Sequence, residues 1–258
     1  MSAETILDLR TVAVPSRRDR LAVSLESVDW TVRAGEFWIV GGPQGSGKSD
    51  LLFVLAGLAK PLRGQGTLFG QDMGAHFGDE HLTHRLRTGL VFDDARLFHH
   101  LTIAENLALP VRYHQNLHAE EVAPWVDALL RATELTEFAD HTPGMITRGW
   151  RRRAALARAL ALRPEVLFLE NPLRGLDAPH SAWWIHFVQQ LWRGHELMSG
   201  RNLTVIATTD EFRPWQEAGA LLNGAQFATL AQGKFSVAGP SAPVDETPSP
   251  TATAFQEN

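Results

Sequence analysis

The sequence contains no cysteine, which excludes a disulfide framework, a thiolate metal site and a cysteine nucleophile. It also has no long apolar run, because the longest, Leu51 to Ala59, is far shorter than the roughly 20 residues of a membrane-spanning helix. The segment Met1 to Arg10 lacks a basic part followed by an apolar core, so we expect no secretory signal. A net charge of -5 argues against non-specific binding to nucleic acid. We therefore expect a soluble cytoplasmic protein with no nucleic-acid partner.

The most informative stretch is rich in glycine and lies between two apolar segments. Residues 37–40 predict a strand and residues 51–58 predict a helix. A glycine-rich turn at that place points backbone N–H groups into one concavity, and the helix start adds partial positive charge. The sequence therefore predicts a phosphate-binding loop formed by Gly42, Pro43, Gln44, Gly45, Ser46, Gly47, Lys48 and Ser49.

This loop has a side chain for each part of a bound nucleoside triphosphate. Lys48 is expected to reach the β- and γ-phosphates, and the Ser49 hydroxyl is expected to ligate Mg²⁺. The chain therefore binds a nucleoside triphosphate or descends from one that did.

Strand and helix signals alternate along the rest of the chain, whose 258 residues allow one α/β domain with an insertion or two small domains. The order predicts an α/β fold. The segment after Gly239 is rich in Pro, Ser, Thr and Ala, and we expect it to be disordered. Strands are expected over residues 6–14, 21–32, 66–70, 90–92, 166–169 and 203–207 and in a hairpin over 225–237; helices are expected within 103–145 and over 151–162, 182–197 and 213–220.

Two further stretches point to a family. Residues Arg151 to Asp177 read RRRAALARALALRPEVLFLENPLRGLD, and residues Leu97 to Pro110 read LFHHLTIAENLALP. With the phosphate-binding loop, these stretches resemble the ATP-binding subunit of ABC transporters over about residues 5 to 239. The resemblance implies a P-loop NTPase fold with a RecA-like core, an antiparallel β subdomain and an inserted α-helical subdomain over about residues 94–163. It implies one nucleotide-binding domain over residues 1–239 and a disordered tail over 240–258.

The resemblance also implies cofactors and partners. Both stretches are most similar to the subunit that drives MCE-associated (Mla-type) phospholipid transport. In the family, two such domains pair head to tail, and each ATP lies between one phosphate loop and the signature of the other chain. We therefore expect ATP and Mg²⁺, integral-membrane permease subunits and a second ATP-binding subunit, in a homodimer or a heterodimer. The location expected is the inner face of the cell membrane, reached through the partner subunits.

The chain departs from the family pattern after residues 166–169, where the family carries Asp and then Glu before Pro. Glu170 falls at the position of the Mg²⁺-supporting Asp, and Asn171 falls at that of the general base. An amide orients water but cannot accept its proton, and the loss of a base typically lowers the rate by about 10²- to 10⁴-fold. Asp93 replaces the loop glutamine with a carboxylate that is able to ligate Mg²⁺. Thr209 replaces the switch histidine with a shorter side chain.

The family's LSGGQ signature also differs, because residues 146–150 read ITRGW. The predicted partner-site signature consists of Thr147, Arg148, Gly149 and Trp150. Arg148 either obstructs closure on the partner's γ-phosphate or acts as a substitute phosphate clamp. No aromatic residue occurs between Met1 and Asp29, so stacking of adenine on an aromatic ring is expected to be absent.

Three functions are open at this point. The first is an ATP-binding subunit of a lipid-type ABC transporter that binds ATP but hydrolyses it weakly or not at all. The second is an active transport ATPase that uses Asp93 or Glu170 as base and Arg148 as clamp. The third is a soluble nucleotide-binding adaptor without a membrane partner, against which the resemblance over Leu97 to Pro110 argues.

Overall fold

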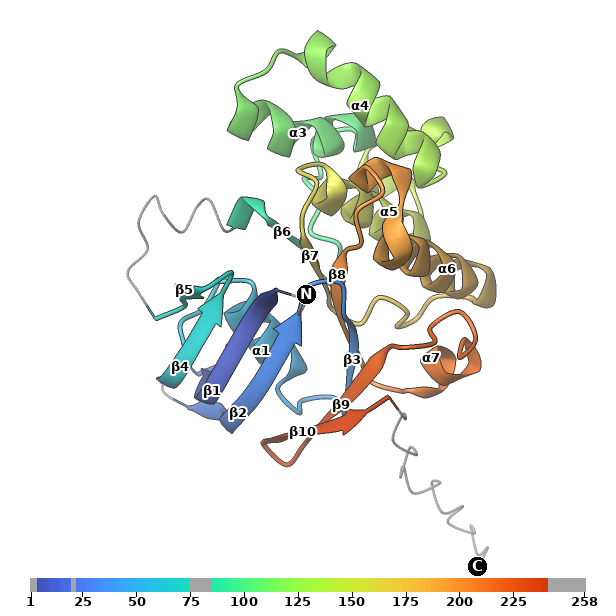
Figure 1. Cartoon of the computed structure of the whole chain (residues 1–258). Coiled ribbons are helices and arrows are strands. Elements are labelled where there is room, and N and C mark those ends of the chain that lie inside the picture. Colours follow the sequence, from blue (N-terminus) through green and yellow to red (C-terminus); the bar gives the residue numbers. More distant parts are fainter. Residues whose placement is uncertain (1–3, 20–21, 75–84, 241–258) are drawn as a thin grey trace, which may run out of the picture.

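The computed structural model describes residues 4–19, 22–74 and 85–240, which form an α/β fold with two sheets (Figure 1). The larger sheet has six strands in the order β10-β9-β3-β8-β7-β6, and the smaller has four in the order β2-β1-β4-β5. The larger sheet contains β3 (Phe37–Gly41), β6 (Thr88–Val91), β7 (Val166–Leu169), β8 (Thr204–Thr209), β9 (Gln226–Ala231) and β10 (Lys234–Gly239). The smaller sheet contains β1 (Thr5–Pro15), β2 (Val23–Arg33), β4 (Arg63–Leu68) and β5 (Gln71–Asp72).

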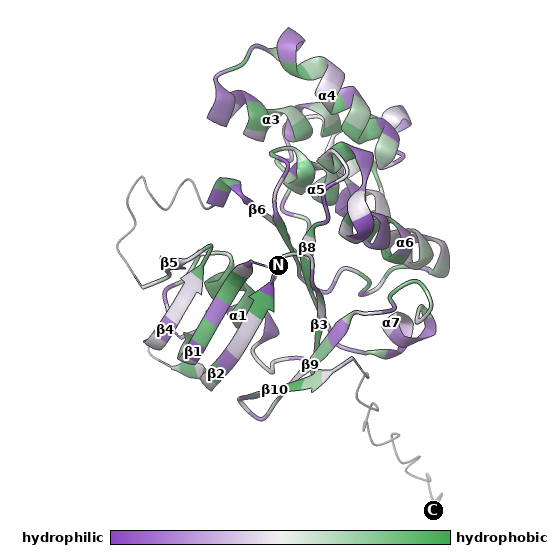
Figure 2. Cartoon of the chain, viewed as in Figure 1, coloured by the Kyte–Doolittle hydropathy of each residue, from purple (hydrophilic) through white to green (hydrophobic). Residues whose placement is uncertain are grey.

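Five neighbouring strands of the larger sheet, β6, β7, β8, β3 and β9, run parallel. Every residue of β3, β7 and β8 is buried, which explains why the sequence shows continuous apolar runs there instead of alternation. Figure 2 shows the same strands as a hydrophobic centre of the molecule. Because parallel strands end at one edge of the sheet, the segments that follow β3, β7 and β8 meet at that edge.

Helix α1 (Lys48–Leu55) packs between the two sheets. Its buried apolar residues, Leu51, Leu52, Val54 and Leu55, belong to one cluster with side chains from β1, β2 and the larger sheet. The smaller sheet is antiparallel, and β2 buries alternate residues in its second half, as expected for a sheet with one covered face. The first residues of α1 therefore lie at the edge where the parallel strands end.

The other face of the larger sheet is covered by helices that share a second buried cluster. In Figure 1, α3 and α4 lie farthest from the sheets. None of the helices in the described ranges has the length and apolar content that crossing a membrane requires. Besides α1, the described residues include the helical elements α3 (Ile103–Gln115), α4 (Ala119–Ala132), η1 (Thr136–Phe138), η2 (Pro143–Met145), α5 (Arg148–Leu160), α6 (Ala178–Gly194), η3 (Glu196–Met198) and α7 (Arg213–Glu217).

The predicted α/β class is confirmed, with differences at the ends of elements. The helical block expected over 103–145 is divided, because Asn116 has a φ of +52° and ends α3 in a left-handed conformation. The hairpin is present as β9 and β10, and it turns at Gln232 and Gly233, both with positive φ. Helices α3 to α5 lie within residues 94–163, while the exact domain limits stay a prediction. Beyond residue 240 the predicted tail lies outside the described residues.

Asn106 organises the chain before and at the start of α3. Its side chain is 0% exposed, accepts a hydrogen bond from the N–H of Phe98, and donates to the carbonyl oxygens of Phe98, Leu101 and Thr102. Replacing Asn106 with Ala leaves these groups without partners, so we expect a loss of about 2 kcal/mol in the free energy of unfolding. Thermal unfolding measures it, with the exposed Arg112→Ala as control on the same helix. Equal melting temperatures for the two variants would contradict this role.

Glu165 and Arg87 join the entries of β7 and β6. The Arg87 Nε and Nη2 lie 2.7 and 2.8 Å from the two carboxylate oxygens of Glu165. The hydrogen bond from Arg87 lowers the pKa of Glu165 below its ordinary 4.5. This pair therefore stabilises the fold above about pH 4.5, and its contribution disappears as the pH falls through the lowered pKa.

Replacing Glu165 with Gln is expected to remove this part of the acid dependence. Melting temperatures between about pH 3 and pH 6 should fall less steeply in the variant than in the original chain. Glu217→Gln serves as control, because Glu217 pairs with Arg213 at an exposed position and contributes little. If the two pH profiles of Glu165→Gln and the original chain run parallel, the assignment is wrong.

Candidate nucleotide-binding site

The phosphate-binding loop connects β3 to α1. Gly47 has a φ of +97°, and a Cβ atom there would lie 2.6 Å from the Ser24 hydroxyl. A Cβ atom on Gly42 would lie 2.2 Å from the carbonyl oxygen of Leu230. Only glycine fits at both positions. The loop is therefore able to turn tightly into the N-terminus of α1, where backbone N–H groups favour an anion.

Lys48, the first residue of α1, is held by acceptors of its own chain. Its Nζ donates to the carbonyl oxygens of Gly42 and Pro43, the second at 2.8 Å, and lies 3.1 Å from Oδ1 of Asp210. The side chain is 4% exposed. Burial lowers the pKa of Lys48, and the Asp210 carboxylate opposes that shift. A phosphate group that binds Lys48 therefore has to replace Asp210 as its acidic partner.

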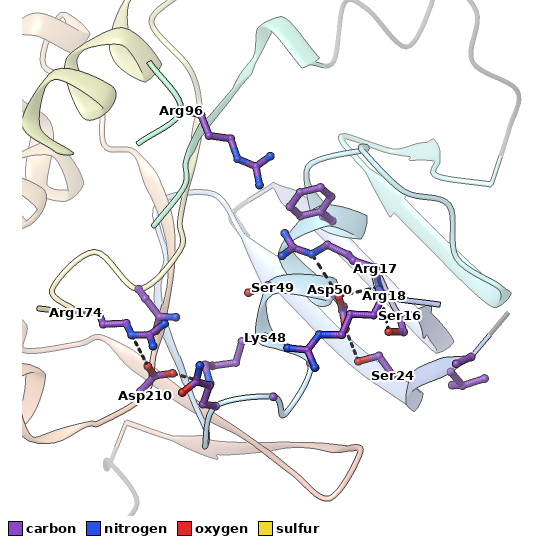
Figure 3. A pocket seen from close by; sticks show the side chains of 17 residues that line it. Ser16, Arg17, Arg18, Ser24, Lys48, Ser49, Asp50, Arg96, Arg174 and Asp210 are labelled. Atoms are coloured by element: carbon purple, nitrogen blue, oxygen red, sulfur yellow. Dashed lines mark hydrogen bonds and ion pairs between the residues drawn. The ribbon is translucent and has the colours of Figure 1, made fainter. Parts of the chain in front are cut away.

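A cleft of about 790 Å³ opens beside the loop (Figure 3). This volume lies within the usual range for a small-molecule site. Five basic and two acidic side chains line the cleft, although the whole chain carries a net charge of -5. Such a concentration of positive charge suits a polyphosphate. The lining includes the predicted Gln44, Gly45, Gly47, Lys48, Ser49 and Asn171, and its charged members are Arg17, Arg18, Lys48, Arg96, Arg174, Asp50 and Asp210.

Sequence reasoning missed most of these charged residues, because they come from separate connections and no local pattern unites them. Lys48 is the exception, since it belongs to the predicted loop, and Asp50 was missed although it directly follows Ser49. Its carboxylate accepts hydrogen bonds from the Ser24 hydroxyl at 2.7 Å and from the N–H of Arg17 at 3.1 Å. Asp50 thus ties the connection between β1 and β2 to the first turn of α1, and it brings Arg17 to the cleft.

Asn171 lines the cleft, and its side-chain amide oxygen has no hydrogen-bond partner. The residue is 7% exposed and has a φ of +44°. Its N–H donates to the Thr208 hydroxyl at 3.1 Å, but its side-chain Oδ1 is buried without a hydrogen-bond partner. A buried acceptor without a partner is rare and calls for a donor such as water or a ligand. Asn171 therefore carries an unsatisfied side-chain acceptor among the residues that line the cleft.

Glu170 lies beside the cleft and faces backbone and arginine donors. The residue is 8% exposed. Its Oε2 accepts a hydrogen bond from the N–H of Asp93 at 3.3 Å, and its Oε1 lies 4.0 Å from Nη1 of Arg17. Glu170 therefore connects the end of β7 to the segment after β6.

Asp93 lies in a cluster of three arginines, outside the lining of the cleft. Arg148 Nη2 donates to its Oδ1 at 2.9 Å, Arg174 Nη1 donates to its Oδ2 at 3.3 Å, and Arg152 Nη2 also donates to Oδ1. Arg152 is 1% exposed, and burial together with nearby Arg174 lowers the pKa of Arg152 to about 10. We call these four residues the Asp93 cluster. It ties α5 to the segments that follow β6 and β7.

The other predicted residues also lie outside the lining of the cleft. Thr209 is bonded to the backbone, since its hydroxyl accepts from the N–H of Glu211 at 3.3 Å and donates to the Glu211 carbonyl oxygen. At the predicted signature, Thr147 precedes α5 as its N-cap. The Trp150 ring lies 5.2 Å from that of His180, and a Cβ atom on Gly149 would lie 2.6 Å from the same ring. The signature thus packs α5 on α6. Its predicted contact with a partner's nucleotide requires a dimer and stays a prediction.

The residues present do not fit a divalent cation. Mg²⁺ takes oxygen ligands, but the carboxylate of Asp93 is bonded to three arginines and that of Glu170 lies against Arg17. Ser49 also lines the cleft, but the carboxylate next to it in the chain, Asp50, is already paired with Arg17. Among residues 4–19, 22–74 and 85–240, no group of three or more His, Cys, Asp or Glu side chains is placed to hold a metal ion. The ligation of Mg²⁺ by Ser49 and Asp93 stays a prediction, and it would require Asp93 to give up its arginine partners.

Comparisons with known proteins agree with the fold. A family model described as ABC transporter matches residues 25–174. Spermidine/putrescine import ATP-binding protein PotA 1 of Pseudomonas aeruginosa is 33% identical over 253 residues, covering 93% of this chain and 64% of that protein. Sulfate/thiosulfate import ATP-binding protein CysA 1 of Agrobacterium fabrum is 31% identical over 257 residues, covering 96% and 68%. The solved dimer of the ATP-binding cassette MJ0796 in a post-hydrolysis state, bound to ADP and Pi, superposes with a TM-score of 0.76 at 26% identity, covering 88% of this chain and 95% of that chain.

The match includes most of the site. Residues 25–174 contain the phosphate-binding loop, the Asp93 cluster, the signature and Asn171. The chain spans less than two thirds of the length of the Pseudomonas protein and less than half of several other import ATP-binding proteins. The similarity therefore concerns only part of those longer proteins.

Proposed function

The chain belongs to the ABC transporter family, and from this premise we propose that it is the ATP-binding subunit of an importer for a small solute. The observation that carries the proposal is the cationic cleft beside Lys48, with a phosphate-binding loop at a helix N-terminus. ATP offers the polyanion that this cleft suits, and its γ-phosphate provides the acceptor that replaces Asp210 at Lys48.

A small solute replaces the phospholipid of the sequence-based hypothesis. The relatives named above carry printed names for the import of spermidine and putrescine or of sulfate and thiosulfate. These solutes have opposite charges, so we assign the choice of solute to partner subunits and the binding of nucleotide to this chain. The Mla-type assignment has no support among these relatives.

We further propose that the chain hydrolyses ATP slowly instead of only binding it. The unpartnered Oδ1 of Asn171 supports this proposal, because an amide is able to orient an attacking water, and phosphoryl transfer depends mainly on positioning and charge. The water oxygen bonds to the γ-phosphorus, the bond to the bridging oxygen of ADP breaks, and the water proton passes to a γ-phosphate oxygen. The rival function is a subunit that binds ATP and regulates transport without turnover.

The proposed partners are integral-membrane permease subunits and a second ATP-binding subunit, at the inner face of the cell membrane. The dimeric state of the solved MJ0796 structure supports a dimer of nucleotide-binding domains. We propose that in such a dimer Thr147, Arg148, Gly149 and Trp150 face the partner's nucleotide. Homodimer and heterodimer are both compatible with this proposal.

The test is ATP binding and turnover by the purified chain, with Lys48→Ala as control. We expect binding that the control weakens by at least about tenfold, since Lys48 is the buried cation of the loop. Slow phosphate release that is lost in the control supports an importer ATPase. Binding without any turnover supports the regulatory rival, and the absence of ATP binding overturns both.

A further inference from the structure

Arg17 lies next to the first turn of α1 and to Glu170, the residue at the position of the family's Mg²⁺-supporting Asp. We propose that the Arg17 guanidinium supplies the positive charge opposite the nucleotide phosphates, so that this chain binds ATP and ADP without a divalent cation. The inference rests on the proposed nucleotide binding. The inference adds that an arginine side chain takes the place of the metal ion at this site.

Four contacts hold Arg17 at this place. Its backbone N–H donates to Oδ1 of Asp50 at 3.1 Å, and its side-chain Nε lies 3.6 Å from the same oxygen. The guanidinium carbon lies 4.2 Å from the centre of the Phe53 ring, and Nη1 lies 4.0 Å from Oε1 of Glu170. Figure 3 shows Arg17 beside Asp50 and near Ser49. The guanidinium therefore lies over the Phe53 ring of α1, between the carboxylates of Asp50 and Glu170.

The carboxylates near this place already have cationic partners. Asp93 is bonded within the Asp93 cluster, Asp50 is paired with Arg17, and Glu170 faces Arg17 and a backbone N–H. A divalent cation bound by Glu170 would have to displace the Arg17 guanidinium or lie next to it, which like charges oppose. The negative charges that could bind a metal ion are thus paired with arginine side chains.

A guanidinium is chemically suited to replace the ion. It stays protonated, and its planar fork donates two parallel hydrogen bonds to phosphate oxygens. Arg17 is partly exposed and lines the same cleft as Lys48. Phosphates bound at Lys48 therefore lie in the cleft that Arg17 also lines. A hydrogen bond from the Arg17 guanidinium to a phosphate oxygen would be strengthened by the opposite charges.

The experiment measures the dissociation constants of ATP and ADP by calorimetry on the full chain, once with excess Mg²⁺ and once with EDTA. For the original chain we expect the two constants to agree within about threefold. In Arg17→Gln the constant in EDTA should rise by about 10- to 100-fold, since a charge-assisted pair is lost. Mg²⁺ should restore part of that loss, because the region beside Glu170 no longer holds a guanidinium.

Arg18→Gln is the matched control. Arg18 lines the same cleft from the same connection, so this variant loses an equal charge without the contact to Glu170. Its two constants should stay equal to each other, even if both rise. Thermal unfolding checks that each variant folds, and Arg17→Lys, which keeps the charge without the fork, replaces Arg17→Gln if the latter does not fold.

Each result has a distinct consequence. Binding by the original chain that EDTA abolishes and Mg²⁺ restores overturns the inference and leaves the proposed function intact. The inference also fails if Arg17→Gln and Arg18→Gln respond alike to EDTA. The absence of nucleotide binding in both buffers overturns the proposed function itself.

Discussion

Replacing Asn171 with Glu is expected to raise the rate of ATP turnover by about 10²- to 10⁴-fold, the usual contribution of a general base. The amide in the original chain orients a water but cannot take its proton. A carboxylate at the same place accepts that proton as the water attacks. The measurement is steady-state release of phosphate from saturating ATP, so that a change in affinity does not enter the comparison.

The geometry of Asn171 supports the direction of this effect. Its side chain lines the cleft that contains Lys48, and its buried Oδ1 has no partner. The φ of +44° favours asparagine over glutamate, at a cost on the order of 1 kcal/mol to the folded state. That cost lowers the melting temperature slightly, but it does not cancel a gain of 10²-fold or more in rate.

Two variants separate chemistry from structure. Asn171→Gln extends the side chain by the same length as glutamate but carries no base, so its turnover should stay at or below that of the original chain. Lys48→Ala combined with Asn171→Glu should abolish the gain, because the nucleotide is no longer held. A glutamate variant that folds, binds ATP and turns over no faster would show that Asn171 does not contact the attacking water.

The parts of this site that the sequence predicts are those with a local signal. The phosphate-binding loop follows a buried strand and opens a helix, and close approaches to Leu230 and Ser24 require glycine at Gly42 and Gly47. The parallel strands appear as continuous apolar runs because both faces of their sheet are covered. In such cases the residues that make a feature are neighbours in the chain.

The parts that the sequence misses are assembled by the fold. Arg17, Arg174 and Asp210 come from three different connections, and only the sheet order brings them to one cleft. Asp93 was expected to face Mg²⁺, since a carboxylate at that position is able to ligate it. Its partners in the structure are arginines of α5 and of the segment after β7, and no spacing in the sequence indicates that pairing.

Replacing Asp93 with Ala is expected to lower the free energy of unfolding by about 3 kcal/mol, which is the cost of leaving a buried charge without its partner. The reason is Arg152, which is 1% exposed and cannot turn its guanidinium to water. Arg152 also donates to the carbonyl oxygens of Asp93, Pro172 and Arg174. These bonds remain in the variant, so we expect the lower end of the range for a broken buried pair. The melting temperature should fall by roughly 6 to 12 °C.

The neighbouring carboxylate provides the control. Asp94 pairs with Arg96 at the surface, where the two side chains are 67% and 45% exposed, so Asp94→Ala should cost less than about 1 kcal/mol. Asp93→Asn keeps hydrogen-bond acceptance without the charge and should lie between the two alanine variants. If the melting temperatures of Asp93→Ala and Asp94→Ala are equal, the Asp93 cluster does not hold α5 to the core. A large loss that Asp93→Asn fully restores would assign the stability to hydrogen-bond geometry instead of charge.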